Sequence, residues 1–373
     1  MKYYLIAGER SGDLHAAKLM QELQKQDANA EFRYWGGDMM QATGGYLVRH
    51  YRELAFMGFK EAITNLFKIL RFLRECTSDI QAYNPDVVIL VDYAGFNLRI
   101  AKFAKANNFK VFYYISPKIW AWNQGRVHTI KKLVDRMFVI MPFEAAFYQR
   151  FDYKVDYIGN PIADMVSAHQ PNTLFRHQNN LPDKPIIAIL PGSRKQEIES
   201  ILSVMLSVIP DFPEYQFVVA AVSNLNPEYY RNIGQKVNVS VVTNQTYDLL
   251  ANAQAALVTS GTATLETALF NVPQIVCYST STISYWIARA VIKVPYISLV
   301  NLIAGKAVVK ELIQAELTSR NIIAELKKIT EDDAFIHQQK KDYQAIRTLL
   351  GEAKSATKAA QLMVKYLTLN TRY

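Results

Sequence analysis

Short apolar runs alternate with helix-like segments along most of this chain. In the first half the runs are Tyr3–Ala7, Val87–Val91, Val111–Ile115 and Met137–Ile140. In the second half they are Ile186–Leu190, Phe217–Ala221, Val239–Val242, Ala255–Val258 and Gln274–Cys277. Short uninterrupted apolar runs are typical of strands that are buried on both faces of a parallel sheet. The alternation therefore predicts an α/β fold with doubly wound, Rossmann-like parallel sheets.

A glycine turn connects the first apolar run to an amphipathic helix. The apolar positions after the turn recur with helical spacing at Ala16, Leu19, Met20 and Leu23. This spacing places the four side chains on one helix face. Asp13 stands where a carboxylate caps such a helix.

The chain is long enough for two domains. Its 373 residues exceed the size of a typical single core. A polar stretch from Ala168 to Lys184 contains two prolines and three asparagines, a composition typical of a linker. We therefore predict domains at residues 1–167 and 168–345, which face each other across a cleft where the carboxyl ends of both sheets meet.

Charge and cysteine usage narrow the classes of partner. The formal net charge is +9, which indicates anionic partners. No dense lysine and arginine run or nucleic-acid-binding fingerprint is present, so nucleic acid is not expected. The first apolar run is too short for a signal peptide, which predicts a cytoplasmic protein. Cys76 and Cys277 are far apart and the histidines form no spaced cluster, so no metal site is expected.

Two turns in the second half have the form of a diphosphate site. The segments Leu190–Arg194 and Thr259–Glu266 each follow an apolar run and precede a helix-like one. The positive end of a helix at such a turn attracts phosphate. The candidate residues are Gly192 and Gly261 for close backbone approach, Ser193, Ser260 and Thr262 for hydroxyl donors, Arg194 for phosphate oxygens and Glu266 for ribose hydroxyls. The alternative is that both are ordinary turns with capping residues.

Asp92 directly follows the most apolar run of the first half. A carboxylate at the mouth of a buried strand is well placed for catalysis in an open α/β sheet. Tyr93 and Phe96 supply apolar walls that would raise its pKa, and Asn97 supplies an amide to orient it, as a general base requires. A structural role as a helix N-cap is the alternative.

Two further turns in the first half carry candidate substrate contacts. Gly8–Asp13 places Glu9 and Ser11 at the end of the first strand, where they suit sugar hydroxyls; the alternative is that Glu9 and Asp13 only cap a helix. Ser116–Asn123 contains two of the four tryptophans. The residues of this region that suit a ring, an acyl chain or a phosphate are Lys118, Trp120, Trp122 and Arg126. Core packing of the tryptophans is the alternative.

The segment 60–83 reads as a basic amphipathic helix. Its proposed apolar face consists of Ile63, Leu66, Phe67, Leu70 and Leu73, and its cations are Lys68, Arg71 and Arg74. Such a helix either lies on an anionic membrane surface or packs on the core with a solvated basic face.

Taken together, the ordered motifs resemble the lipid-A-disaccharide synthase family, whose members join two acylated glucosamines during lipopolysaccharide assembly. The resemblance runs almost from end to end. It is carried by Gly8–Asp13, Met57–Glu61, Val91–Asn97, Ser116–Trp122, Met141–Glu144, Gly159–Pro161, Leu190–Arg194, Thr259–Glu266 and Asn301–Ala304.

The resemblance implies a GT-B fold in which residues 346–373 return as a helix to the first domain. It implies an inverting transfer from UDP-2,3-diacylglucosamine to 2,3-diacylglucosamine 1-phosphate, without metal or cofactor. The amphipathic segment 60–83 and the insoluble substrates lead to the hypothesis that the protein is held peripherally at the inner leaflet of the inner membrane. The sequence does not decide whether the protein forms a homodimer. The family's general base matches Asp92, its sugar turn Glu9 and Ser11, and its nucleotide site Arg194, Ser260, Gly261, Thr262, Glu266 and Asn301. Glu61 joins the candidate acceptor and acyl contacts.

Three positions depart from the family pattern. Arg10 stands where a small residue is frequent in the family. Gly95 stands three residues after the general base, where an acidic residue is frequent, and Val300 stands before Asn301, where proline is frequent. None of them removes a residue that is assigned to chemistry. The alternatives are another GT-B enzyme that uses UDP-N-acetylglucosamine, either a transferase or a 2-epimerase, and a ligand-binding module without catalysis.

Overall fold

The chain forms two compact units in a computed structural model. The structure describes residues 1–53, 66–193, 195–222, 225–233, 239–281, 285–286, 289 and 291–369. Unit 1 comprises Met1–Pro161 together with Glu352–Tyr373, and unit 2 comprises Ile162–Gly351. Both boundaries differ by a few residues from the prediction. The last predicted segment begins inside a helix whose buried residues Ile346 and Leu350 belong to unit 2.

Unit 1 is built on a seven-stranded parallel sheet of order β3-β2-β1-β4-β5-β6-β7. Its strands are β1 (Lys2–Ala7), β2 (Glu31–Gly36), β3 (Tyr46–His50), β4 (Val87–Val91), β5 (Val111–Tyr114), β6 (Arg136–Val139) and β7 (Asp156–Tyr157). Its described helices are α1 (Arg10–Gln26), α2 (Asp38–Thr43), α4 (Leu66–Tyr83), α5 (Ala94–Ala106), α6 (Ile119–Trp122), α7 (Val127–Leu133), α8 (Pro142–Gln149) and α19 (Ser355–Leu369).

Unit 2 repeats this design with a six-stranded parallel sheet of order β10-β9-β8-β11-β12-β13. Its strands are β8 (Ile186–Leu190), β9 (Gln216–Ala221), β10 (Ser240–Thr243), β11 (Ala253–Thr259), β12 (Gln274–Tyr278) and β13 (Lys310–Ile313). Its described helices are α10 (Phe175–Gln178), α11 (Lys195–Leu206), α12 (Pro227–Ile233), α13 (Thr246–Asn252), α14 (Thr262–Leu269), α16 (Leu299–Ala304), α17 (Ser319–Glu331) and α18 (Asp333–Leu350). Helix α9 (Pro161–Ala168) contains the boundary between the units.

The predicted α/β class and parallel sheets are confirmed. All nine predicted strands are present, and β4 and β8 have the predicted bounds. In each sheet the strand order reverses beside a central pair, β1 with β4 and β8 with β11. Loops that leave such a pair in opposite directions open a crevice at the carboxyl ends of the strands.

The core of unit 2 covers both faces of its sheet. Ile187 and Ile189 pack with residues of α11 and α17, whereas Ile186, Ala188 and Leu190 pack with residues of α13. Successive side chains of a strand point to opposite faces, so a strand between two helical layers must be apolar at every position. This requirement explains why the apolar run of β8 is uninterrupted.

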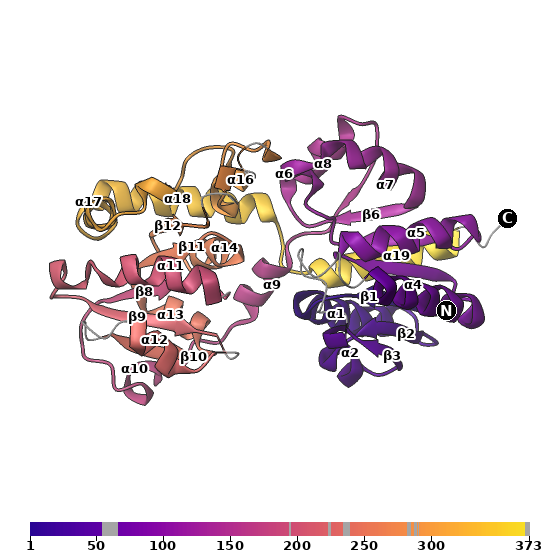
Figure 1. Cartoon of the computed structure of the whole chain (residues 1–373), viewed down its shortest axis with the longest axis horizontal. Coiled ribbons are helices and arrows are strands. Elements are labelled where there is room, and N and C mark those ends of the chain that lie inside the picture. The colour runs from indigo at the N-terminus through magenta and orange to yellow at the C-terminus, as the bar shows by residue number, and fades with distance from the viewer. Residues whose placement is uncertain are drawn as a thin grey trace. The chain divides into compact units, whose positions relative to one another are not determined.

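Helix α19 completes the core of unit 1 although it comes from the end of the chain. Figure 1 shows it, in yellow, among the indigo and purple elements of unit 1, and it packs directly against α1. Its contribution to the core consists of Ala359, Ala360, Met363 and Leu367, all nearly or fully buried. The predicted return of the C-terminal helix is therefore observed.

Helix α4 has a different buried face from the one predicted. Ile69, Phe72, Cys76 and Ile80 are buried, while Phe67 is 88% exposed. Phe72 packs edge-on against Trp35 of β2, which places the buried face of α4 toward the sheet. The apolar residues of the helix are thus divided between the core and the surface. None of the described helices combines the length and the apolar content needed to cross a bilayer.

Asp13 does not cap its own helix, contrary to the prediction. Its buried carboxylate accepts hydrogen bonds from the backbone N–H groups of Gly37 at 2.7 Å, Met39 at 3.0 Å and Met40 at 3.1 Å. These groups belong to the amino end of α2, whose N-cap is Gly37. Asp13 therefore joins α1 to α2 instead of closing a local turn.

We expect Asp13→Ala to lower the free energy of unfolding of unit 1 by about 3 kcal/mol, because it leaves buried N–H donors without an acceptor. Asp13→Asn keeps one acceptor oxygen and should lose less. Urea unfolding followed by tryptophan emission measures this, since Trp35, Trp120 and Trp122 all lie in unit 1. Equal midpoints for the alanine variant and the parent protein would contradict the assignment.

Candidate active site

A cavity of about 360 Å³ lies at the carboxyl ends of β8 and β11 in unit 2. This volume falls within the range of about 300–1,000 Å³ that is usual for small-molecule sites. The cavity is lined by Leu190, Pro191, Gly192, Ser193, Ala220, Val222, Thr246, Thr259, Ser260, Gly261, Thr262, Ala263 and Glu266. Six of the predicted site residues, from two segments far apart in the sequence, therefore meet around one cavity.

The two predicted glycines serve this cavity differently. Gly192 has φ +98°, a conformation that side chains with a Cβ rarely adopt, so the turn after β8 requires glycine. Gly261 has an extended backbone, and a Cβ built on it would meet no atom within 4 Å. The space beside Gly261 is therefore open to a ligand.

The amino end of α14 borders the cavity. Its N-cap is Gly261, which has no side chain to cap the helix. Thr262 and Ala263 of its first turn line the cavity. The first N–H groups of a helix lack partners within the helix and carry partial positive charge. This end of α14 is suited to an anionic group such as a phosphate.

The hydroxyls of the second turn have separate roles. Ser260 Oγ donates to the backbone oxygen of Ile297 at 3.0 Å, so its proton is already used, which differs from the predicted phosphate contact. Thr259 was not predicted, although it also lines the cavity and is 4% exposed. Its hydroxyl finds no hydrogen-bond partner among the residues that the structure describes. Thr259 is therefore a buried hydroxyl beside the cavity without a partner among these residues.

Glu266 supplies the carboxylate of the cavity. Burial raises the pKa of Glu266 above its ordinary value, and a hydrogen bond from the Tyr247 hydroxyl opposes that shift. The donor–acceptor distance from Tyr247 Oη to Glu266 Oε1 is 3.3 Å. Its second oxygen is available to a ligand hydroxyl.

Asn301 is not among the residues that line this cavity. Its side-chain oxygen accepts the N–H groups of Val308 and Val309, and its amide nitrogen donates to Val309 O and to Glu311 Oε1 at 2.9 Å each. The amide thus makes all of its hydrogen bonds within the protein. Asn301 lines a different cavity of unit 2, of about 660 Å³, and its predicted ligand contact stays a prediction. Glu311 also accepts from the Ser298 hydroxyl at 2.7 Å and thereby holds the segment before α16.

Two predicted residues, Arg194 and Glu61, lie outside the described residues. The same holds for the first part of the predicted helix 60–83 and for the whole of the motif Met57–Glu61.

In unit 1, Asp92 lies at the carboxyl end of β4, where hydrogen bonds to its backbone oxygen hold it. Asp92 and Tyr93 have φ values of 45° and 46°; aspartate is one of the residue types that adopt this left-handed region, whereas tyrosine seldom does. The backbone oxygen of Asp92 accepts hydrogen bonds from Asn97 Nδ2 at 2.8 Å and from the Tyr113 hydroxyl. Strained backbone of this kind persists where surrounding contacts impose it, and it is frequent at functional sites. Asn97 therefore orients Asp92 as predicted, by a hydrogen bond to the Asp92 backbone oxygen.

The Asp92 carboxyl lies in a polar but desolvated environment. Burial raises its pKa above the ordinary value, the charge of Lys118 lowers it, and the charge of Glu9 raises it. These couplings bring together the ends of β1, β4 and β5, since Glu9 follows β1 and Lys118 follows β5. A carboxylate with a raised pKa beside a cation matches the requirements for a general base.

The capping alternatives in unit 1 do not hold. The N-cap of α5 is Tyr93, so Asp92 is not the cap residue of that helix. Glu9 is the N-cap of α1 but makes no side-chain hydrogen bond to it, and its side chain is exposed. Ser11 is exposed on the first turn of the same helix.

The two tryptophans of the loop after β5 separate into a buried and an exposed residue. Trp120 is 5% exposed, which agrees with the core-packing alternative. Trp122 is 45% exposed, and the Arg126 guanidinium lies 5.4 Å from its ring centroid. The exposed pair and Lys118 are thus the part of the loop that can meet a ligand.

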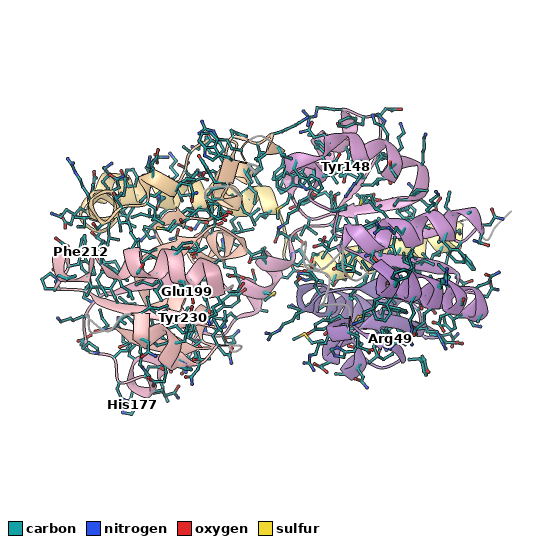
Figure 2. All side chains as sticks on the ribbon, viewed as in Figure 1. Arg49, Tyr148, His177, Glu199, Phe212 and Tyr230 are labelled. Atoms are coloured by element: carbon teal, nitrogen blue, oxygen red, sulfur yellow. The ribbon has the colours of Figure 1, made fainter. Side chains whose placement is uncertain are left out.

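Glu144 was not predicted to be a site residue, yet it fixes this loop. It is 2% exposed, and its carboxylate accepts hydrogen bonds from the Trp120 indole at 3.1 Å and from the N–H groups of Ile140 at 3.1 Å and Met141 at 2.9 Å. Burial raises its pKa to about 7, although these donors favour the ionised form. The residue belongs to α8, the helix that also carries the labelled Tyr148 (Figure 2).

Comparisons with known proteins agree with the motif pattern. A family model described as lipid-A-disaccharide synthetase matches residues 3–366. The chain is 38% identical over 370 residues to a lipid-A-disaccharide synthase from Myxococcus xanthus, with 97% of each chain covered. It is also 38% identical over 364 residues to the enzyme of that name from Syntrophus aciditrophicus, with 95% of each covered.

Solved structures of the same fold include epimerases and glycosyltransferases. The UDP-GlcNAc 2-epimerase from Neisseria meningitidis bound to UDP-GlcNAc has a TM-score of 0.62 at 17% identity, with 99% of this chain and 100% of that chain covered. The calicheamicin glycosyltransferase CalG4 has a TM-score of 0.63 at 15% identity, with 100% of this chain and 99% of that chain covered. These similarities confirm the predicted GT-B fold and do not favour the UDP-N-acetylglucosamine alternative.

Because the pKa of Glu144 is raised in the folded protein, the folded state binds its proton more tightly than the unfolded state. The contribution of Glu144 to stability should therefore grow as the pH falls from about 7 toward 5.5, by about 2 kcal/mol. Relative to Glu144→Gln, which does not titrate, the parent protein should gain stability over this interval. Urea unfolding of both proteins across the interval measures it. A difference that is independent of pH would contradict the raised pKa.

Proposed function

This chain belongs to the lipid-A-disaccharide synthetase family, and we propose that the residues described above perform the family's reaction. The enzyme is a glycosyltransferase of lipid A biosynthesis. The reaction moves 2,3-diacylglucosamine from its UDP derivative to 2,3-diacylglucosamine 1-phosphate and releases UDP. The observation that supports the residue assignment best is the cavity of unit 2, in which six predicted nucleotide contacts meet.

The UDP part of the donor binds in that cavity. Its diphosphate lies against the amino end of α14, near the turn with Gly192, and takes donors from Ser193 and Thr262. Arg194 follows that turn in the sequence and supplies a cation with two donors for phosphate oxygens. Glu266 accepts a hydrogen bond from the ribose.

Asp92 acts as the general base in unit 1. Its carboxylate takes the proton from the 6-hydroxyl of the acceptor while that oxygen forms a bond to the anomeric carbon of the donor. The bond from this carbon to UDP breaks, and UDP leaves with the electron pair. Attack from the face opposite UDP inverts the carbon, giving a β-1,6-linked disaccharide 1-phosphate. Glu9 and Ser11 hold sugar hydroxyls, and Lys118, Trp122 and Arg126 contact the phosphate or acyl part of the acceptor.

The departing UDP carries the negative charge that develops in the transition state. Fixed N–H groups and a cation aimed at such charge stabilise it without reorganisation. We therefore infer that α14 and Arg194 do the work that a divalent ion performs in other nucleotide-sugar enzymes, so that the reaction needs no metal.

The exposed apolar residues of α4 support contact with a membrane surface. Phe67 is 88% and Leu70 is 42% exposed, and the same stretch of helix carries Lys68, Arg71 and Arg74 at its surface. A helix with exposed apolar residues and nearby cations binds anionic lipid surfaces. We infer that this part of α4 holds the enzyme at the inner leaflet, in the cytoplasm, where acylated substrates reside.

We expect Asp92→Asn to lower the rate of acceptor-dependent UDP release by at least about 100-fold, because it removes the base. UDP affinity should not change, since the nucleotide cavity lies in unit 2. Asp152→Asn, which replaces an exposed carboxylate of the same unit, is the matched control. The parent activity should persist in EDTA and should fall at acid pH with a midpoint above the ordinary aspartate pKa.

Each arm of this assay separates the alternatives. UDP release without acceptor indicates a hydrolase or epimerase, and UDP binding without release indicates a binding module. Full activity of Asp92→Asn would reject Asp92 as the base, and loss of activity in EDTA would reject the metal-free reaction.

The double variant Phe67→Ser and Leu70→Ser should reduce co-sedimentation with phosphatidylglycerol-containing vesicles several-fold, because both apolar side chains leave the exposed surface. Leu174→Ser with Leu349→Ser is the matched control, since these leucines are 58% and 51% exposed but belong to unit 2. If the folded α4 variant sediments as the parent protein does, α4 is not the membrane contact.

A further inference from the structure

Tyr247 is hydrogen-bonded to Glu266, the carboxylate of the nucleotide cavity. It belongs to the first turn of α13, whereas Glu266 belongs to α14, and its hydroxyl donates to Glu266 Oε1 at 3.3 Å. Its neighbour Thr246 lines the cavity, but Tyr247 itself does not. We propose that Tyr247 is a positioning residue that holds the Glu266 carboxylate so that its other oxygen accepts a hydrogen bond from a ribose hydroxyl of UDP. This inference rests on the proposed function.

The Tyr247 ring is held by two other aromatic rings. The His169 ring meets it edge-on at 5.5 Å between centroids, and the Phe270 ring lies at 5.2 Å. His169 is fixed in turn, because its Nε2 lies 3.1 Å from Asp248 Oδ1. The same carboxylate oxygen accepts the backbone N–H of Asn172 at 2.9 Å. The tyrosine hydroxyl therefore has a defined position before any ligand arrives.

A defined hydroxyl matters because the end of a glutamate side chain is conformationally soft. The terminal torsion of glutamate has a broad distribution, so a lone carboxylate samples many orientations. Ordering it during binding costs free energy that a preorganised group has already spent. One hydrogen bond to Oε1 restricts the carboxylate and leaves Oε2 to accept a ligand hydroxyl.

The chemistry of the contact predicts a ligand-specific effect. Tyr247 acts only through Glu266, and Glu266 contacts UDP only through a ribose hydroxyl. Removal of the tyrosine hydroxyl should therefore weaken the binding of UDP and leave unchanged the binding of a nucleotide that lacks the hydroxyl in question. Damage to the fold of the cavity would weaken all nucleotides alike.

The experiment measures the affinities of the full-length protein for UDP, 2′-deoxy-UDP and 3′-deoxy-UDP by titration calorimetry. Tyr247→Phe should bind UDP about tenfold more weakly than the parent protein does. For one of the two deoxynucleotides the parent and the variant should bind equally. In the background of Glu266→Ala, Tyr247→Phe should have no further effect on UDP, as expected for two residues that act through one contact.

Tyr229→Phe is the matched control. Its hydroxyl donates to Glu199 Oε1 at 2.8 Å, and neither residue lines the cavity; Glu199 is labelled in Figure 2. This variant removes the same kind of hydrogen bond from the same unit and should bind all three nucleotides as the parent protein does.

Unchanged UDP affinity of Tyr247→Phe, or an equal loss for all three nucleotides, would overturn the inference while leaving the proposed function intact. Failure of the parent protein to bind UDP would instead overturn the proposed function, and the inference with it.

Discussion

The positions of the candidate sites depend on one feature of the sheets. Two parallel strands pair side by side, and their connections leave in opposite directions. This pairing occurs twice, between β1 and β4 and between β8 and β11. At each pair the adjoining turns diverge, and helices begin there with free N–H groups. Glu9, Ser11 and Asp92 of unit 1 stand on these turns, as do both candidate phosphate turns of unit 2, so their positions follow from the strand pairing. Lys118, Trp122 and Arg126 come instead from the segment after the neighbouring strand β5.

The two pairs are used for opposite charges. In unit 2 the turns present the amino end of a helix and hydroxyls, which favour an anion. In unit 1 the turns present Asp92 and Glu9, and the burial of Asp92 together with the charge of Glu9 raises the pKa of Asp92. One architecture thus carries a candidate phosphate site and a candidate proton-accepting site, because the side chains on the turns differ while the backbone arrangement is the same.

The sequence was informative where burial is complete on both faces. The runs of β4 and β8 are uninterrupted, and their bounds were predicted to the residue. The strands β2, β3, β7 and β13 were not predicted. Three of them lie at sheet edges, where a strand is partly solvated and carries polar residues such as those of Lys310–Ile313. Strand β2 lies inside its sheet, but Glu31 and Arg33 interrupt its apolar pattern. Where a buried strand is predicted to the residue, the start of the turn that follows it is known as well. The candidate phosphate turns and Asp92 could therefore be located. The partners of Asp13, Asn301 and Glu144 could not, since each is a long-range or tertiary contact that no periodicity encodes.

Helix α19 gives unit 1 an unusual dependence on the rest of the chain. Four of its side chains belong to the core of unit 1, yet the whole of unit 2 separates them in sequence from the strands they cover. During synthesis from the amino end, the ribosome delivers every strand of unit 1 first and its last core layer only at the end. Unit 2 can complete its own core earlier. The nascent chain therefore carries an uncovered apolar face on α1 and its sheet for most of its synthesis, whereas every core segment of unit 2 is synthesised before α19.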